Sequence, residues 1–177
     1  MVEHNLPSPQ LISAYRAALI SAGDGLLWSG LKGEAIEHYL QAEAAAGDPL
    51  PLSVRAARTG SYPYALEEHL VNREWTDAAR ILDRWEEDFP SDKAKGQTFY
   101  WRGRLHLARE EAARAARFLG QSLLLAKGAP YENQARWLLA NAYTALGEHE
   151  KSDQTLNALL QSGIQDEFTE KARARLK

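Results

Sequence analysis

The chain has 177 residues, of which 45% are apolar, and a formal charge of −3 in which acidic and basic residues are interleaved. This length and composition are sufficient for one ordinary domain with a hydrophobic core. The lack of cysteine excludes disulfides, thiolate metal sites and cysteine nucleophiles, and the mixed charge makes nucleic acid a poor partner.

Neither a secretory leader nor a membrane span is expected. The first nine residues lack the basic and then apolar regions of a signal peptide. No apolar run approaches the roughly 20 residues that a transmembrane helix needs. We therefore expect a soluble protein with no membrane insertion, with the cytoplasm as the favoured compartment. A domain excised from a longer protein is the alternative.

The N-terminal part of the chain predicts two helices. Ser8 and Pro9 are typical of an N-cap followed by proline in the first turn. The first helix then meets Gly23 and Gly25, which together cost a helix interior roughly 2 kcal/mol relative to alanine. Helix propensity favours a break there, and a helix that continues through both glycines is the alternative. The second helix is expected over 34–46.

The central part of the chain is less regular at its start. Residues 49–60 are the least regular stretch, with two short helical turns expected over 53–58. Helices are then predicted over 63–73 and 77–88, the second of which is closed by Pro90.

Two further helices are predicted over 94–108 and 112–126. Neither glycine nor proline separates them, so local propensity alone would join them into one long helix. We predict a turn near Arg109, because the register of the repeat described below requires one.

The clearest signal is a helical hairpin over 137–160. Apolar residues recur at three- and four-residue steps as far as Leu146, and Gly147 then provides a left-handed C-cap. A second helix starts at once. The last amphipathic stretch, 166–177, has the polar outer face expected of a capping helix.

This hairpin resembles the tetratricopeptide repeat, and its pattern recurs along the chain. Each second helix has a small residue, a bulky residue four positions later and another inward residue three positions beyond that. Equivalent residues of successive second helices are 43, 37 and 37 positions apart. The three sets are Ala35, Ala78, Ala115 and Ser152; Tyr39, Leu82, Leu119 and Leu156; and Ala42, Trp85, Ser122 and Leu159. The partners in the first helices are Gly23, Leu66, Gly103 and Ala140.

The resemblance implies an all-α fold, a right-handed α-solenoid of antiparallel helix hairpins with a C-terminal capping helix. It implies one domain, 1–177, with eight to ten helices and no paired strands. The approximate repeats are 16–49, 59–92, 96–129 and 133–166, and the cap is 166–177. In this frame the first helix continues through Gly23.

The resemblance also indicates where a partner would bind. In this family the first helix of each hairpin lines a concave groove that holds peptides, and aromatic and arginine side chains are favoured at interfaces. The candidate peptide-binding residues are Tyr64, Glu67, Tyr100, Trp101, Arg104, Trp137 and Asn141. The alternative is that Trp101 and Trp137 pack between neighbouring hairpins.

No pattern in the sequence indicates catalysis. The five histidines have no metal-ligand spacing, and no phosphate loop or nucleophile elbow is present. His69 and His106 are expected to be partly buried rings with one hydrogen bond each. We therefore expect no catalytic residues, no metal and no cofactor.

The leading expectation is a non-catalytic scaffold that binds a protein or peptide partner. The alternative is a structural, oligomerisation or docking module without a peptide ligand, whose surfaces drive self-association or dock it against other domains of a longer chain. A catalytic domain is the third class left open.

Overall fold

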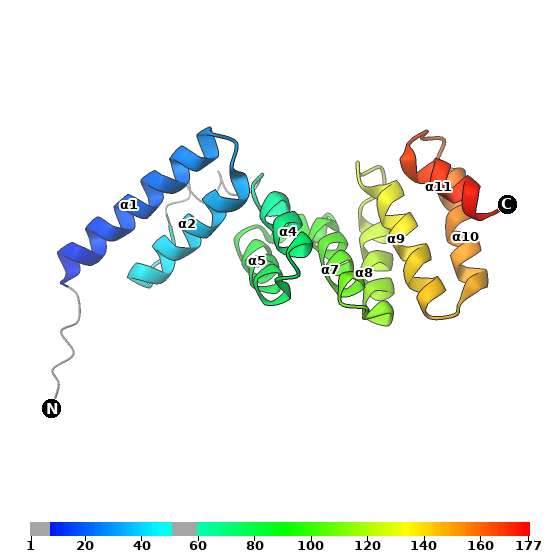
Figure 1. Ribbon diagram of the computed structural model, residues 1–177, viewed down its shortest axis with the longest axis horizontal. Coiled ribbons are helices and arrows are strands. Elements are labelled where there is room, and N and C mark those ends of the chain that lie inside the picture. The colour runs from blue at the N-terminus through cyan, green and yellow to red at the C-terminus, as the bar shows by residue number, and fades with distance from the viewer. Residues whose placement is uncertain (1–7, 51–59) are drawn as a thin grey trace, which may run out of the picture. The chain divides into compact units, whose positions relative to one another are not determined.

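The computed structural model describes residues 8–50 and 60–177, so the helical turns expected over 53–58 lie outside the described residues. Across the described ranges the chain forms ten α-helices and no strand, which confirms the all-α prediction (Figure 1). None of these helices has the length and apolar character needed to cross a membrane. The chain divides into two compact units, Met1–Glu68 and His69–Lys177.

The first unit contains a helical hairpin. Its helices are α1 (Pro9–Trp28) and α2 (Lys32–Ala46), and α4 (Tyr62–Val71) begins in this unit. Ser8 is the N-cap of α1, as predicted, and its hydroxyl accepts the Leu11 N–H at 3.3 Å. The buried core of the hairpin comprises Leu19, Ala35, Tyr39, Ala42 and Leu50.

Helix α1 continues through Gly23, so the continuous alternative is correct and the break favoured by propensity does not occur. A Cβ atom on Gly23 would lie 2.7 Å from Cε1 of Tyr39, so only glycine permits this approach of α1 and α2. The Tyr39 hydroxyl donates to Asp24 Oδ1 at 2.7 Å. Packing between the helices therefore outweighs the low helix propensity of glycine.

The segment after α2 is tied to the hairpin by hydrogen bonds. The buried Glu43 carboxylate accepts the Leu50 N–H at 2.9 Å. Arg16 on α1 donates to the carbonyls of Asp48 and Pro49 at 3.3 and 2.9 Å. The charged groups of Glu43 and Arg16 therefore hold the end of α2 against α1.

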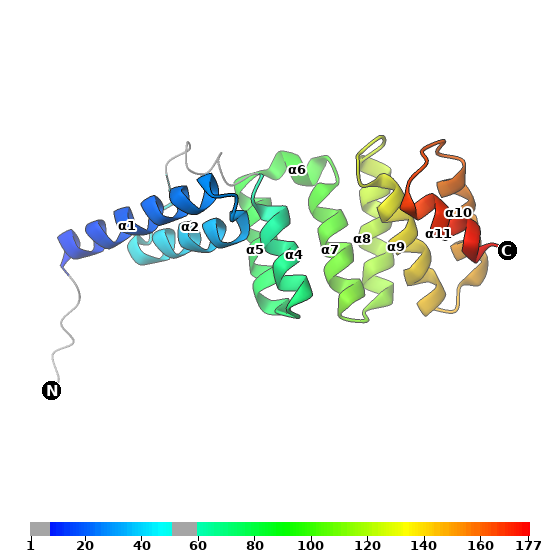
Figure 2. The ribbon, with the colours of Figure 1, turned by 45° about the horizontal axis from the view of Figure 1, so that its top comes forward.

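The second unit is a series of helices that pack on their neighbours in the chain. Consecutive helices from α7 to α10 lie side by side and alternate in direction (Figure 2). The helices are α5 (Trp75–Asp88), α6 (Pro90–Ala94), α7 (Gln97–Ala108), α8 (Ala112–Leu125), α9 (Glu132–Ala145), α10 (His149–Leu160) and α11 (Glu167–Arg175).

The short helix α6 was not predicted. Pro90 follows the end of α5, as expected, but it also occupies the first turn of α6. Trp85 Nε1 donates to the buried Asp92 carboxylate at 2.9 Å and so fixes α6 against α5. The helix expected from residue 94 begins only after Gly96, which is left-handed with φ 82°.

Four turns between helices share one backbone conformation. In each, a residue with positive φ is followed by a residue whose N–H donates to the carbonyl five positions back, as in a Schellman motif. The positive-φ residues are Gly30, Arg73, Glu110 and Gly147, with φ of 81°, 61°, 61° and 75°. The donor–acceptor pairs are Leu31–Leu26, Glu74–His69, Glu111–His106 and Glu148–Tyr143, at 2.8–2.9 Å. The turn predicted near Arg109 is therefore confirmed, although no glycine marks it.

The periodic positions of the sequence are buried. All twelve residues of the three sets have at most 2% of their surface exposed. They are Ala35, Tyr39, Ala42, Ala78, Leu82, Trp85, Ala115, Leu119, Ser122, Ser152, Leu156 and Leu159. Their expected partners Gly23, Leu66, Gly103 and Ala140 are buried as well. The prediction that this register faces inward is confirmed.

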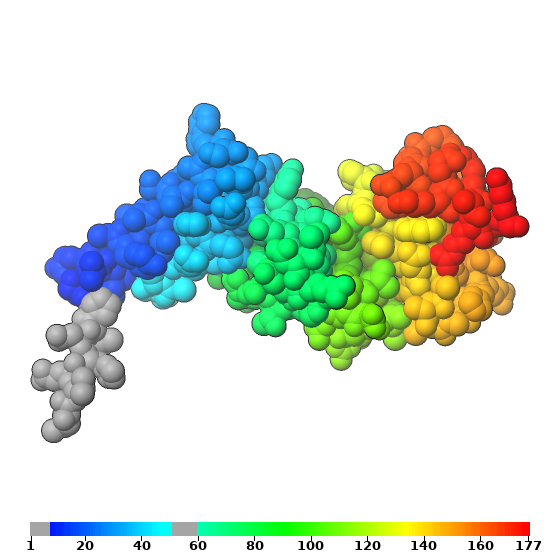
Figure 3. All heavy atoms as spheres, in the orientation of Figure 1, coloured from blue at the N-terminus to red at the C-terminus, as the bar shows by residue number. Residues whose placement is uncertain are grey.

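Helix α11 lies against the α9–α10 hairpin (Figure 3). Asp166 caps it by accepting the N–H groups of Phe168 and Thr169 at 3.0 and 2.9 Å, and the Asn133 amide donates to the same carboxylate at 2.9 Å. Burial raises the pKa of Asp166, but these hydrogen bonds outweigh it and hold the pKa below its ordinary value.

An ion network joins α5 to α7. Arg102 donates to Glu86 and Asp83, both at 2.7 Å, and Lys93 donates to Glu86 at 2.9 Å. Burial raises the pKa of Glu86, but the hydrogen bonds from Arg102 and Lys93 outweigh it and lower the pKa below its ordinary value. The network fixes the side of α7 that faces α5.

Candidate functional site

The seven predicted binding residues are divided between the two units. Tyr64 and Glu67 lie on α4 in the first unit, where both side chains are exposed and the Lys32 ammonium lies 4.5 Å from the centroid of the Tyr64 ring. The other five lie on α7 and α9 in the second unit. The face that these two helices carry is therefore the candidate site.

Two of the α7 residues belong to the core. Tyr100 and Trp101 have only 3% and 7% of their surface exposed. The Tyr100 ring stacks on the Tyr131 ring with centroids 4.6 Å apart. The Trp101 ring contacts the Tyr100 ring edge-on, with centroids 5.5 Å apart. Both rings are therefore buried, and the Tyr100 ring packs against Tyr131, the N-cap residue of α9.

Arg104 extends this cluster towards solvent. It follows Trp101 by three residues, and its guanidinium lies 4.5 Å from the Trp101 ring centroid and 5.8 Å from that of Tyr100. A guanidinium at these distances is attracted to the face of an aromatic ring. Arg104 is partly exposed, so a positive charge is held in a fixed position at the surface of α7.

The α9 residues contact the capping helix. Trp137 and Asn141 are partly exposed. The Arg175 guanidinium of α11 lies 5.6 Å from the Trp137 ring centroid, and it donates to Asn141 Oδ1 at 2.6 Å. It also donates to the hydroxyl of Thr144. Part of the predicted face is therefore in contact with the C-terminal end of the chain itself.

Arg175 and Tyr131 were missed by sequence reasoning. Tyr131 precedes α9 and stacks on a ring 31 positions earlier, and Arg175 bonds to a side chain 34 positions earlier. No local pattern reports contacts at such separations. The one available signal was the capping helix, because a helix that covers the last hairpin must place some of its side chains on α9.

The second unit thus contains two guanidinium–indole pairs, Arg104 with Trp101 and Arg175 with Trp137. Charged hydrogen bonds from a guanidinium to a carboxylate are among the strong ones in proteins, and the planar group can bind both oxygens. The arrangement suits recognition of an acidic or C-terminal carboxylate.

The histidines have structural contacts. His69 Nδ1 lies 2.6 Å from Glu74 Oε2, and His106 Nδ1 lies 2.8 Å from Glu111 Oε2. The His106 ring also stacks on Phe118 with centroids 5.1 Å apart. Both rings are partly buried and hydrogen-bonded, as predicted. The hydrogen bond with His106 is the main cause of the lowered pKa of Glu111.

Within residues 8–50 and 60–177, no group of three or more His, Cys, Asp or Glu side chains is placed to hold a metal ion. No family model, no curated protein and no solved structure matches this chain. The residues of the candidate site are therefore the basis for a functional assignment.

Proposed function

We propose that this chain is a non-catalytic protein-interaction module built from helical repeats of the tetratricopeptide type, arranged as a right-handed solenoid with α11 as its cap. Two observations support the repeat. The twelve residues of the periodic register are all buried, and four turns at matching intervals have the same backbone conformation. A common local geometry that recurs at the intervals of the buried register, 43, 37 and 37 residues, is expected of repeated hairpins.

The proposed ligand is a protein segment, extended or in a short helix, that carries a carboxylate. The observation that carries this proposal is the partly exposed guanidinium of Arg104 held on the Trp101 ring. The pair lies on a first helix of a hairpin, where partners of such modules bind. A carboxylate would bind the guanidinium, and apolar side chains of the segment would contact Trp137.

The experiment selects peptides from a random displayed library against the full chain and measures their affinities by fluorescence polarisation. Arg104→Ala should weaken the selected peptides at least about tenfold, the effect expected when a charged hydrogen bond is lost. Arg114→Ala is the matched control, because Arg114 is an exposed arginine on α8, a second helix. Circular dichroism checks that both variants fold.

Two results would contradict the peptide-binding proposal. The first is a selection that enriches no peptide for the wild-type chain. The second is equal affinity of the selected peptides for both arginine variants.

A structural or docking module is the second candidate. The observation in its favour is that Arg175 occupies the Asn141 side chain and the Trp137 ring, so that part of the predicted face is already in contact with α11. Arg175→Ala separates the two candidates, because it should strengthen peptide binding if α11 competes with a ligand for this face. A selection that enriches no peptide for the wild-type chain or for Arg175→Ala favours the docking module.

A further inference from the structure

Helix α11 brings a guanidinium to a position on α9 that matches the position of Arg104 on α7. Tyr100 and Trp137 are 37 positions apart, the same interval as the left-handed turn residues that follow them. The Arg104 guanidinium lies 5.8 Å from the Tyr100 ring centroid. The Arg175 guanidinium lies 5.6 Å from the Trp137 ring centroid. Two equivalent rings of successive hairpins therefore have one guanidinium each.

The second guanidinium takes the place of a side chain that α9 lacks. Arg104 follows the first of these rings by four positions, whereas Asn141 follows Trp137 by four. Arg175 donates to Asn141 Oδ1 at 2.6 Å, so its guanidinium lies at the end of the side chain that corresponds to Arg104. The capping helix thus supplies a charge that the last hairpin does not contain at this position.

The charge of Arg175 is not compensated by any carboxylate in the described part of the chain. Its hydrogen bonds go to three neutral side-chain oxygens, those of Asn141, Thr144 and Ser152. The other two cations of α11, Lys171 and Arg173, each pair with a glutamate of the same helix, at 2.6 and 2.5 Å. Arg175 is also exposed, so its charge is accessible to a ligand from solvent.

We propose that Arg175 is a second ligand-binding residue, and that Arg104 and Arg175 each bind one of two acidic side chains of the same segment. This inference rests on the peptide binding proposed above and specifies the chemistry of the peptide. A guanidinium has five N–H donors. The hydrogen bonds of Arg175 use at most three of them, so two remain for a carboxylate. Helix α11 is then part of the binding surface as well as the cover of the last hairpin.

The separation of the two guanidinium groups determines the spacing of the acidic residues. Helices α7 and α9 contact each other directly. The axes of packed helices lie roughly 8–10 Å apart, so equivalent side chains on them are separated by about the same distance. In an extended segment, residues i and i+2 point to the same side and are roughly 7 Å apart, which two flexible acidic side chains can widen. Neighbouring side chains on a helix are only about 5–6 Å apart. The spacing therefore favours an extended segment with acidic residues at i and i+2.

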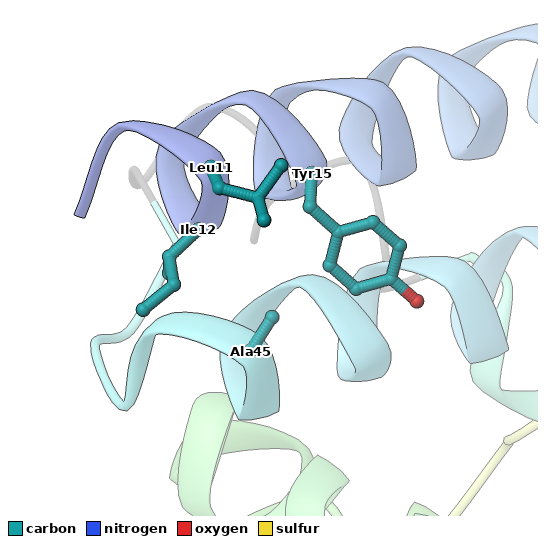
Figure 4. A pocket seen from close by; sticks show the side chains of 4 residues that line it. All are labelled: Leu11, Ile12, Tyr15 and Ala45. Carbon is teal, nitrogen blue, oxygen red and sulfur yellow. The ribbon is translucent and has the colours of Figure 1, made fainter. Parts of the chain in front are cut away.

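The apolar hollow of the first unit does not suit such a ligand. It has a volume of about 420 Å³ and lies between the start of α1 and the end of α2 (Figure 4). Its lining consists of Leu11, Ile12, Tyr15 and Ala45, none of which is charged. Two carboxylates would find no opposite charge there, so charge complementarity favours the second unit as their binding site.

The first test is the sequence of the peptides that the full chain selects. The displayed library presents internal segments, so every carboxylate in it belongs to a side chain. Selection against the wild-type chain should enrich two acidic residues at positions i and i+2. Selection against Arg175→Gln, in which glutamine keeps an N–H donor without the charge, should enrich only one. A single acidic position in both selections would overturn the proposal and leave the role of Arg104 intact.

A double-mutant cycle on one selected peptide tests the pairing itself. Arg175→Gln should weaken the peptide about tenfold in fluorescence polarisation, the effect expected when a charged hydrogen bond is lost. Replacing the second acidic residue of the peptide by its amide should have a similar effect with the wild-type chain and no further effect with Arg175→Gln. Arg173→Gln is the matched control, because Arg173 lies on the same helix and pairs with Glu170. It should leave the affinity unchanged.

The possible failures separate this inference from the proposed function. If Arg104→Ala weakens binding but Arg175→Gln leaves it unchanged or strengthens it, Arg175 is not a ligand-binding residue and only the present inference is overturned. A selection that enriches no peptide contradicts both. Circular dichroism and hydrogen exchange over 167–175 check that α11 stays folded. If Arg175→Gln loosens α11, the amide-substituted peptide decides the question with the wild-type chain, and an unchanged affinity for it overturns the inference.

Discussion

The α1–α2 hairpin and the α9–α10 hairpin have the same internal design and differ in what covers them. Each ends its first helix with a left-handed glycine, Gly30 or Gly147, and each buries a large side chain of the second helix, Tyr39 or Leu156. The α9–α10 hairpin is covered by α11, whose Ala172 completes the buried cluster. In α1, by contrast, Leu11, Tyr15 and Trp28 remain exposed.

The difference shows that pairing within a hairpin and coverage of a hairpin are specified separately. The periodic small and bulky residues pair the two helices wherever they occur. Coverage requires a further segment with its own capping and apolar contacts, and at the C-terminal hairpin Asp166 and Phe168 provide these. If this is correct, substitutions in the two hairpins should show similar packing between paired helices, and the effects of α11 should be confined to the α9–α10 hairpin.

The largest effect is expected for Leu156→Ala. Leu156 is fully buried, so its truncation should destabilise the chain by about 2–5 kcal/mol in urea unfolding. Because Ala172 lies in the same cluster, amide hydrogen exchange over 167–175 should also become faster. Asn157→Ala, at the exposed neighbouring position, is the control. Unchanged exchange in α11 would show that the cap is held independently of the hairpin.

The second effect concerns two glycines in α1. Gly23→Ala should destabilise by about 1–3 kcal/mol, because the new methyl group meets the buried Tyr39 ring at 2.7 Å. Gly25→Ala should stabilise by about 0.5–1 kcal/mol, because nothing lies within 4 Å of its Cβ position and alanine is the better helix former. Thermal unfolding of both variants measures the difference. Equal effects would mean that Gly23 does not set the approach of α1 and α2.

The third effect is local to the cap. Asp166→Ala removes the N-cap of α11 and should destabilise by about 0.5–2 kcal/mol. Glu167→Ala, in the same turn but exposed, should change stability by less than about 0.5 kcal/mol. Urea unfolding followed by far-ultraviolet circular dichroism distinguishes them. Matching losses in the two variants would rule out a specific capping contribution.

The smallest effect is expected from acid. The pKa of Asp166 is lower in the folded chain than its ordinary value, so its ionised form stabilises α11 at neutral pH. This contribution is fully present above the ordinary pKa of about 4 and is lost as the pH falls through the lowered one. The protection factors of the α11 amides, which are corrected for the intrinsic exchange rate at each pH, should therefore fall on acidification, and less so in Asp166→Asn, which keeps a capping oxygen without titrating. The same pH dependence in both forms would contradict the assignment.

The helices were predictable from the sequence because their signals are local. Ser8, Pro9 and Gly147 are placed as helix-end rules require, and the buried register repeats within each hairpin. The break at Gly23 was wrong because propensity does not include the Tyr39 ring that packs there. Helix α6 was missed because proline reads equally well as the end of one helix and the start of another.

The candidate site was predictable only in part. The register placed Arg104, Trp137 and Asn141 on the correct helices, and all three are partly exposed. It could not show that Tyr100 stacks on Tyr131, because that contact depends on where the segment before α9 lies relative to α7. Burial of an aromatic residue is decided by such long-range contacts, and aromatic periodicity is the same for a core ring and for a binding ring.

The repeated turn has a consequence for how such a chain can change its length over evolution. The left-handed residues Arg73, Glu110 and Gly147 are spaced by equal intervals of 37 residues, so each interval begins and ends at the same backbone conformation. Removing or duplicating one whole interval would join equivalent points of two hairpins and leave every turn intact. The longer interval of 43 residues, from Gly30 to Arg73, also begins and ends at this conformation. Duplication of one interval within the gene can therefore lengthen this chain in one step without disturbing a turn.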